Sequence, residues 1–156
     1  HRDLHTAYRR QRQMCIRDRV FTSHSPEETL DLGESLAREL PAGAIVLLYG
    51  DLGAGKSVFA RGIARFYGIP EKEVRSPTFT LLNIHISLRG AVNHFDLYRI
   101  GDSEELFQLG FDEHLEEGAV TIIEWAEKAE IPPDSYAVKV TITLLDENTR
   151  KITIER

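Results

Sequence analysis

The stretch Gly50-Asp51-Leu52-Gly53-Ala54-Gly55-Lys56-Ser57 is a complete G-x-x-x-x-G-K-[ST] phosphate-binding loop. The apolar run 44–49 before it is typical of a buried strand, and Phe59 and Ile63 after it have helical spacing. A strand, this loop and a helix form the context in which the motif binds phosphate. A glycine-rich turn without a ligand is the alternative, but the complete motif favours a nucleoside triphosphate as the ligand.

The residue types of the loop explain how it would bind phosphate. Its glycines allow successive backbone N–H groups to face phosphate oxygens, where the N-terminus of the following helix adds a favourable field. The Lys56 ammonium reaches the β- and γ-phosphates in such loops, and the Ser57 hydroxyl is a ligand for magnesium. The loop therefore predicts a nucleotide and Mg²⁺ as ligands.

Length and composition limit the other possibilities. The chain has 156 residues, which is enough for one domain with a substantial core and short for two. It has no apolar run of about eighteen residues, so we expect no membrane-spanning segment. The single cysteine, Cys15, excludes an intramolecular disulfide and fits a reducing cytoplasm.

The first nineteen residues differ in composition from the rest. They hold six of the nineteen basic residues, all arginine, and show no helix or strand period. A basic arm for nucleic acid, a targeting peptide and a foreign segment left by sequence assembly are the open interpretations. A transit peptide is rich in serine and poor in acids, whereas this segment has Asp3, Asp18 and no serine. We expect residues 1–19 to be a disordered or non-native leader and residues 20–156 to form one P-loop domain.

The remainder of the chain is strongly acidic. From Val20 onward it has 13 basic and 23 acidic residues, so its net charge is −10, compared with −6 for the whole chain. A body of this charge is poorly suited to bind phosphate backbones by itself. If nucleic acid is involved, we expect a partner protein to hold it.

The hydrophobic pattern predicts an α/β domain, a P-loop NTPase-like three-layer architecture with a mixed, partly parallel β-sheet. We expect parallel strands near the loop and antiparallel strands at the margins. Ser25 and Pro26 predict a helix N-cap and first helical residue, and Ser103 predicts the cap of a later helix. The expected strands are 20–22, 44–49, 79–87, 91–96, 119–125, 136–145 and 151–155, and the expected helices are 26–40, 56–67, 104–109 and 112–115.

Glu124 is a candidate magnesium ligand because it is an acid at the end of an expected buried strand. P-loop proteins hold magnesium through such an acid, directly or through water. A solvated strand end is the alternative interpretation. Trp125, the only tryptophan, either packs in the core or forms a wall of the nucleotide pocket.

The segment His94-Phe95-Asp96-Leu97-Tyr98-Arg99 is a second unusual cluster. Strand alternation puts His94, Asp96 and Tyr98 on one face. Asp96 is a candidate for orienting the attacking water or a magnesium-bound water, and a polar strand end with local hydrogen bonds is the alternative. His94 alone is more typical of a structural histidine. Ser76-Pro77-Thr78 is similar to a switch loop whose threonine hydroxyl meets the γ-phosphate and magnesium.

Together these segments resemble the TsaE family, the small bacterial ATPases of tRNA threonylcarbamoyladenosine biosynthesis. The order and spacing of four motifs carry the resemblance, which covers about residues 20–156. Members often have threonine where this chain has Ser57, and both residues offer the hydroxyl. The four motifs are the phosphate-binding loop, Ser76-Pro77-Thr78-Phe79, the cluster 94–99 and Ile123-Glu124-Trp125.

The resemblance implies hydrolysis of ATP with Mg²⁺ in a cytoplasmic complex with TsaD and TsaB, which attach threonylcarbamoyl to adenosine 37 of tRNA. Together with the acidic charge of the body, it predicts contact with tRNA only through that complex, and the lack of a long apolar run predicts no contact with a membrane. The implied catalytic residues are Lys56, Asp96 and Thr78, and the implied metal ligands are Ser57 and Glu124. The implied nucleotide-binding residues are Asp51, Leu52, Gly53, Ala54, Gly55, Lys56, Ser57, Trp125, Glu127 and Arg150, the last two by a less specific match.

Other functional classes remain open at this point. A small-molecule or nucleotide kinase usually carries an arginine-rich lid, and the arginines that follow the expected loop helix form no cluster in the sequence. A GTPase would need an Asn-Lys-x-Asp guanine motif, which the chain lacks. A nucleotide sensor without catalysis is the third class. Phosphate release from ATP without an added acceptor distinguishes these alternatives.

Overall fold

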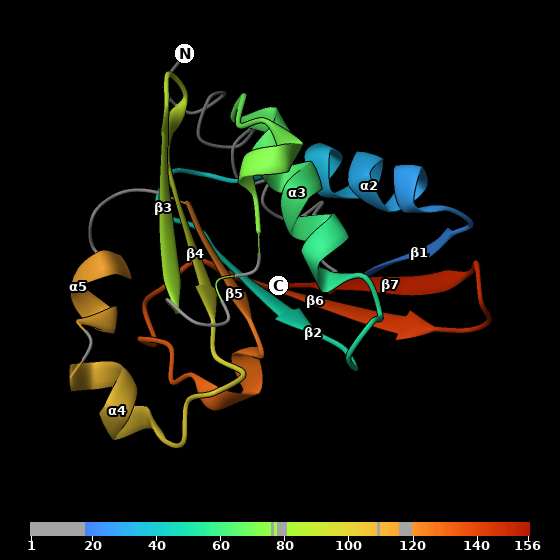
Figure 1. Ribbon diagram of the computed structural model, residues 1–156. Helices are drawn as coiled ribbons and strands as arrows, with labels where there is room; N and C mark the ends of the chain where they lie inside the picture. The colour runs from blue at the N-terminus through green and yellow to red at the C-terminus, as the bar shows by residue number, and fades with distance from the viewer. Residues whose placement is uncertain (1–17, 76, 78–80, 109, 116–119) are drawn as a thin grey trace, which may run out of the picture.

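The computed structural model describes residues 18–75, 77, 81–108, 110–115 and 120–156, which are arranged around one seven-stranded sheet (Figure 1). None of the helices in these ranges is long and apolar enough to cross a membrane. The strands are β1 (Arg19–Ser23), β2 (Ile45–Tyr49), β3 (Leu82–Ser87), β4 (Gly90–Asp96), β5 (Val120–Glu124), β6 (Ala137–Leu144) and β7 (Arg150–Glu155). The helices are α2 (Pro26–Glu39), α3 (Lys56–Phe66), α4 (Ser103–Gln108) and α5 (Phe111–Leu115), with short 3₁₀ turns η1 (Glu71–Glu73) and η2 (Ala126–Lys128).

The sheet has a parallel centre and antiparallel margins. Its strand order is β1-β7-β6-β2-β5-β4-β3, and β6, β2, β5 and β4 run parallel to one another. β7 and β1 are antiparallel at one margin, and β3 is antiparallel at the other. The first four residues of β2 are buried, because layers on both faces cover a central parallel strand. This arrangement confirms the predicted mixed, partly parallel sheet.

Helices α2 and α3 pack together over one face of the sheet (Figure 1). Helix α2 begins as predicted, because the Ser25 hydroxyl accepts a hydrogen bond from the Glu28 N–H and Pro26 is the first helical residue. Val46 and Leu48 of β2 face these helices and belong to the larger hydrophobic core. This layer supports α3, whose first turn follows the phosphate-binding loop.

A second layer covers the opposite face of the sheet. Ile45 and Leu47 alternate with the residues that face α2 and α3, and they pack in a separate core with Leu106 of α4 and Phe111 of α5. The trace after η2 contributes Ile131 to the same core. The sheet therefore lies between two layers, as the three-layer prediction required.

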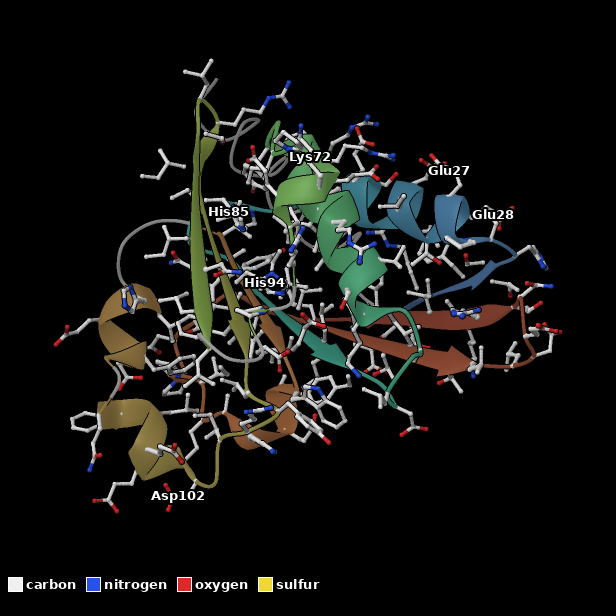
Figure 2. The ribbon with its side chains drawn as sticks, in the orientation of Figure 1. Glu27, Glu28, Lys72, His85, His94 and Asp102 are labelled. Atoms are coloured by element: carbon white, nitrogen blue, oxygen red, sulfur yellow. The ribbon has the colours of Figure 1, made fainter. Side chains whose placement is uncertain are left out.

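Two local predictions are wrong. The cap of α4 is Asp102 rather than Ser103: Asp102 Oδ1 accepts a hydrogen bond from the Glu105 N–H at 2.9 Å, and Ser103 already belongs to the helix (Figure 2). Arg19, which its composition places in the leader, pairs with Ile154 as part of β1 and forms an ion pair with Glu39 of α2. The boundary was misplaced because pairing with β7 extends the strand beyond its apolar pattern. The separateness of the preceding segment, which lies outside the described residues, stays a prediction.

Candidate active site

The phosphate-binding loop joins β2 to α3 at the carboxyl edge of the parallel strands. Gly55 precedes the helix with a φ of 115°, a left-handed conformation that favours glycine over residues with a Cβ. No side chain caps α3, so its first backbone N–H groups face the loop rather than a serine or aspartate oxygen. A helix N-terminus beside a glycine-rich turn favours an anion.

Lys56 is the first residue of α3 and is 6 % exposed. Its ammonium donates hydrogen bonds to the carbonyl oxygens of Gly50 and Asp51. The same Nζ lies 4.3 Å from the centroid of the Trp125 ring. Backbone carbonyls and an aromatic face both stabilise a cation that is shielded from water. These contacts hold the Lys56 ammonium inside the site, beside the loop.

Glu124 ends β5 beside β2 and is 3 % exposed. Its two carboxylate oxygens have different partners. Oε1 accepts a hydrogen bond from the Ser57 hydroxyl at 3.2 Å, and Oε2 lies 2.7 Å from Nε2 of His94. The predicted pair of metal ligands, Ser57 and Glu124, is therefore in direct contact, although the two residues are far apart in the sequence.

Asp96 ends β4 directly beside Glu124 in the parallel register and is 4 % exposed. Its Oδ1 accepts a hydrogen bond from the Tyr98 N–H at 3.0 Å, which orients the carboxylate. The Tyr98 ring in turn lies 5.0 Å from the Trp125 ring, centroid to centroid, at an interplanar angle of 52°. Two carboxylates and two aromatic rings thus lie at the strand ends that face the loop.

These groups line one cavity of about 420 Å³, a volume within the range of small-ligand sites. Eight of its ten lining residues are site residues predicted from the sequence. The additional two are Tyr98 and Val58. The lining consists of Leu52, Gly53, Gly55, Lys56, Ser57, Val58, Asp96, Tyr98, Glu124 and Trp125.

Four other predicted site residues, Asp51, Ala54, Glu127 and Arg150, are not among the described residues that line this cavity. Asp51 and Ala54 belong to the loop and contribute backbone contacts, the Ala54 N–H donating to the Asp51 carbonyl at 3.0 Å. Arg150 lies behind the loop, where its Nε donates to the Ala54 carbonyl at 2.8 Å. Glu127 is exposed on η2, and its charge adds to burial in raising the pKa of Tyr49. Thr78 lies outside the described residues.

Sequence reasoning missed the contribution of two residues. Strand alternation puts Tyr98 on the face of Asp96 but indicates no role for it in the site, and the sequence alone indicates a structural role for His94. The signal for Tyr98 was its place in the 94–99 cluster, next to a predicted catalytic acid. No sequence signal pairs His94 with Glu124, because that contact depends on the lateral register of β4 and β5.

Ser57 and Glu124 offer the oxygen donors that the prediction of a magnesium ion requires. Across the described part of the chain, no group of three or more His, Cys, Asp or Glu side chains could hold a metal ion. Ser57 and Glu124 supply a hydroxyl and a carboxylate in contact with each other. Mg²⁺ prefers oxygen ligands and is commonly bound by one or two protein groups together with substrate phosphates.

Comparison with known proteins gives a consistent match. The family model described as "Threonylcarbamoyl adenosine biosynthesis protein TsaE" matches residues 23–152. Proteins named tRNA threonylcarbamoyladenosine biosynthesis protein TsaE are similar to this chain. The one from Rickettsia conorii is 39 % identical over 86 % of this chain and 77 % of its own length. The one from Treponema pallidum is 36 % identical over 85 % and 96 %.

A solved structure is also similar. The crystal structure of Bacillus subtilis YdiB superimposes with a TM-score of 0.67 at 27 % sequence identity. The match covers 88 % of this chain and 84 % of the YdiB chain. The arrangement of sheet and helices described above is therefore shared with a protein of known structure.

Proposed function

Because the chain belongs to the TsaE family of threonylcarbamoyl adenosine biosynthesis proteins, we propose that it is a magnesium-dependent ATPase of that pathway. It acts with the partner proteins TsaD and TsaB in the cytoplasm, where they attach threonylcarbamoyl to adenosine 37 of tRNA. The chain itself meets tRNA only through that complex. Its own chemistry is the binding and hydrolysis of ATP.

The observation that carries this proposal is the convergence of four groups on one cavity. Lys56, Ser57, Asp96 and Glu124 come from α3, β4 and β5, and all four line the space beside the glycine-rich loop. A cation, a hydroxyl and two carboxylates around a phosphate-binding loop are the parts that P-loop NTPases use for phosphoryl transfer.

The loop and Lys56 bind the triphosphate. Backbone N–H groups at the start of α3 donate hydrogen bonds to the phosphate oxygens, and Lys56 leaves its carbonyl contacts to bind the β- and γ-phosphates. This exchange replaces backbone carbonyls with phosphate oxygens of full negative charge, which are stronger partners for an ammonium. The ring of Trp125, which contacts the ammonium before ATP binds, forms a wall on one side of the site and excludes water there.

Asp96 positions the attacking water. Its carboxylate is buried, is oriented by the Tyr98 N–H and lies beside Glu124. A fixed acceptor of this kind holds a water in line with the phosphate, which is the main task of a protein in phosphoryl transfer. Ser57 and Glu124 would hold Mg²⁺, which neutralises charge on the β- and γ-phosphate oxygens when it is bound.

The test of this proposal is phosphate release from ATP and Mg²⁺ with no acceptor added. We expect release by the natural chain, and a loss of ATP affinity of about 100-fold in Lys56→Ala, because the phosphates lose their charged partner in the loop. Lys72→Ala is the matched control, since Lys72 is exposed on η1 outside the cavity (Figure 2). Calorimetric titration gives the affinities. Unchanged affinity in Lys56→Ala would contradict the site, and transfer of phosphate only to an added acceptor would indicate a kinase.

A further inference from the structure

His94 contacts the proposed magnesium ligand from inside the protein. Its Nε2 lies 2.7 Å from Oε2 of Glu124, and both side chains are buried, His94 being 1 % exposed. His94 does not line the cavity, whereas Glu124 does. The imidazole, which belongs to β4, therefore contacts the carboxylate from outside the cavity (Figure 2).

The chemistry of the pair fixes which atom donates. A carboxylate that binds magnesium is ionised and only accepts hydrogen bonds, so in that state the ring nitrogen that faces Oε2 carries the hydrogen. In the neutral ring the other nitrogen, Nδ1, is then an acceptor. Nδ1 is buried and has no hydrogen-bond partner among the described residues. Glu124 is thus the one described side chain to which the His94 ring donates.

The two oxygens of the Glu124 carboxylate therefore have different roles. Oε2 is held by His94, and Oε1 faces the Ser57 hydroxyl at the cavity. A carboxylate with one oxygen fixed in this way has lost its rotation about the last side-chain bond before any ligand arrives. Groups that orient a metal ligand in this manner commonly change metal affinity by 10- to 100-fold when they are replaced.

We propose that His94 is a positioning residue: its Nε2–H holds Oε2 of Glu124 so that Oε1 stays directed at Ser57 and at the magnesium carried by ATP. The inference rests on the proposed function, because it assigns a role within the same site. It differs from the interpretation of His94 as core packing, which predicts an effect on stability without a specific effect on magnesium.

Two amide substitutions separate these interpretations. In His94→Gln the side-chain amide nitrogen can reach the position of Nε2, whereas in His94→Asn the amide is too short and falls near the position of Nδ1. The quantity to compare is the gain in ATP affinity from magnesium, which is the affinity with Mg²⁺ divided by the affinity without it. We expect His94→Asn to lower this gain by about tenfold and His94→Gln to keep it within about threefold of the gain in the natural chain. ATP affinity without magnesium should change less than twofold in both.

The measurement is calorimetric titration of ATP with Mg²⁺ and with a chelator, alongside the melting temperature of the ligand-free protein. His24→Gln is the control, because His24 is an exposed histidine between β1 and α2 and does not line the cavity. It should leave the magnesium-dependent gain unchanged. A second measurement needs no ligand: in the ¹⁵N-labelled natural chain, the His94 ring should show its hydrogen on Nε2, and Glu124→Leu should change that signal.

Each result has one meaning. Equal magnesium-dependent affinities in folded His94→Asn and His94→Gln would overturn the positioning role, as would a loss that follows the melting temperature alone. If His94→Asn does not fold, an unchanged ring signal in Glu124→Leu would overturn it. Failure of the natural chain to gain affinity from magnesium would instead contradict the proposed function.

Discussion

Trp125 shows how single residues build this site. It follows β5 with a φ of 57°, a left-handed conformation that is uncommon for residues other than glycine. Such a conformation costs on the order of 1–3 kcal/mol and persists where surrounding contacts over-determine it. Here Lys56 lies over the ring, and Tyr98 packs against it. In this conformation the indole contacts Lys56 of α3 and lines the same cavity as Glu124.

Trp125 should report ATP binding directly. It is the only tryptophan of the chain, and the Lys56 ammonium lies against its ring. When Lys56 moves to the phosphates, the charge near the indole changes, so the emission of the protein should change on addition of ATP. Fluorescence titration checks this, and Lys56→Ala should lose the response. A constant emission while calorimetry detects binding would contradict the movement of Lys56.

Asp96→Asn should separate binding from hydrolysis. The amide keeps the size of the side chain but cannot hold a water as a carboxylate does. We therefore expect ATP affinity within about tenfold of the natural chain and a turnover lowered by about 100-fold. Phosphate release at saturating ATP measures the turnover.

Glu124→Ala should act differently from Asp96→Asn, with its largest effect on the magnesium concentration needed for hydrolysis. Normal hydrolysis by both variants would contradict both assignments.

The residues of the candidate site that belong to local sequence patterns could be predicted. The contact that depends on how the strands are ordered in the sheet could not. Lys56, Ser57 and the loop follow from one contiguous stretch, and the acids Asp96 and Glu124 follow from their places at strand ends. The support of Glu124 by His94 requires that β4 lie beside β5 in one register. Strand order is a property of the tertiary fold, so a local pattern contains no information about this contact.

At the scale of elements, the position of α3 depends on its close contact with α2. A Cβ added at Gly62 would lie 2.2 Å from the Leu30 carbonyl oxygen, and one at Gly33 would lie 2.4 Å from the Phe59 carbonyl oxygen. The two helices therefore approach backbone to backbone. Arg65 extends the contact, because its guanidinium forms ion pairs with Asp31 and Glu34 of α2 at 2.6 and 2.7 Å. This packing sets the direction in which α3 presents its N-terminus to the loop.

Gly62→Ala should destabilise the protein. Alanine favours a helix interior over glycine by roughly 1 kcal/mol, but here its Cβ meets a backbone carbonyl that cannot move without separating the helices. We expect a net loss of about 2 kcal/mol in the free energy of unfolding, since overpacking of this kind costs about 1–3 kcal/mol. Urea denaturation measures it. Gly101→Ala is the control, because its Cβ would meet only a flexible glutamate oxygen at 3.5 Å. A more stable Gly62→Ala variant would contradict the close packing.

Helix ends and strand ends were less predictable than the elements themselves. The N-cap of α2 was correct because Ser25 is followed at once by proline and acids, a combination with few other interpretations. The cap of α4 was misplaced by one residue because Asp102 and Ser103 are both good capping residues. Only the hydrogen bond to the third helical N–H distinguishes them.

At the scale of the whole molecule, Tyr67 links stability to alkaline pH. Burial at the end of α3 raises the pKa of its phenol from 10.0 to about 12. Below pH 10 the folded and unfolded chains both keep this proton, so stability is unaffected. Between pH 10 and about 12 the unfolded chain releases the proton first, and the free energy of unfolding should fall by up to about 1.4 kcal/mol per pH unit. Urea denaturation across this range should show the fall, and Tyr67→Phe should reduce it.

The charge of the whole molecule makes a prediction about its partners. From Val20 onward the net charge is −10, and few phosphates of a nucleic acid could be neutralised by such a body. We therefore expect no appreciable binding of tRNA by this chain alone at physiological salt. The proposed role in the tRNA modification pathway then requires that other proteins hold the tRNA, and that ATP controls contact with them.

Coupling between ATP and partner binding follows from the same site. The cavity is open to the surface through Leu52 and Tyr98, both exposed, so bound ATP would alter the surface offered to a partner. Purified TsaB and TsaD should retain this chain more strongly with a slowly hydrolysed ATP analogue and magnesium than with ADP.

Repeated rounds of tRNA modification should need the chain and hydrolysable ATP, and Lys56→Ala should fail to support them. Lys72→Ala should succeed, because its exposed side chain lies outside the cavity. Tight tRNA binding by the chain alone, or full modification without it, would contradict the proposal that partner proteins hold the tRNA while this chain hydrolyses ATP.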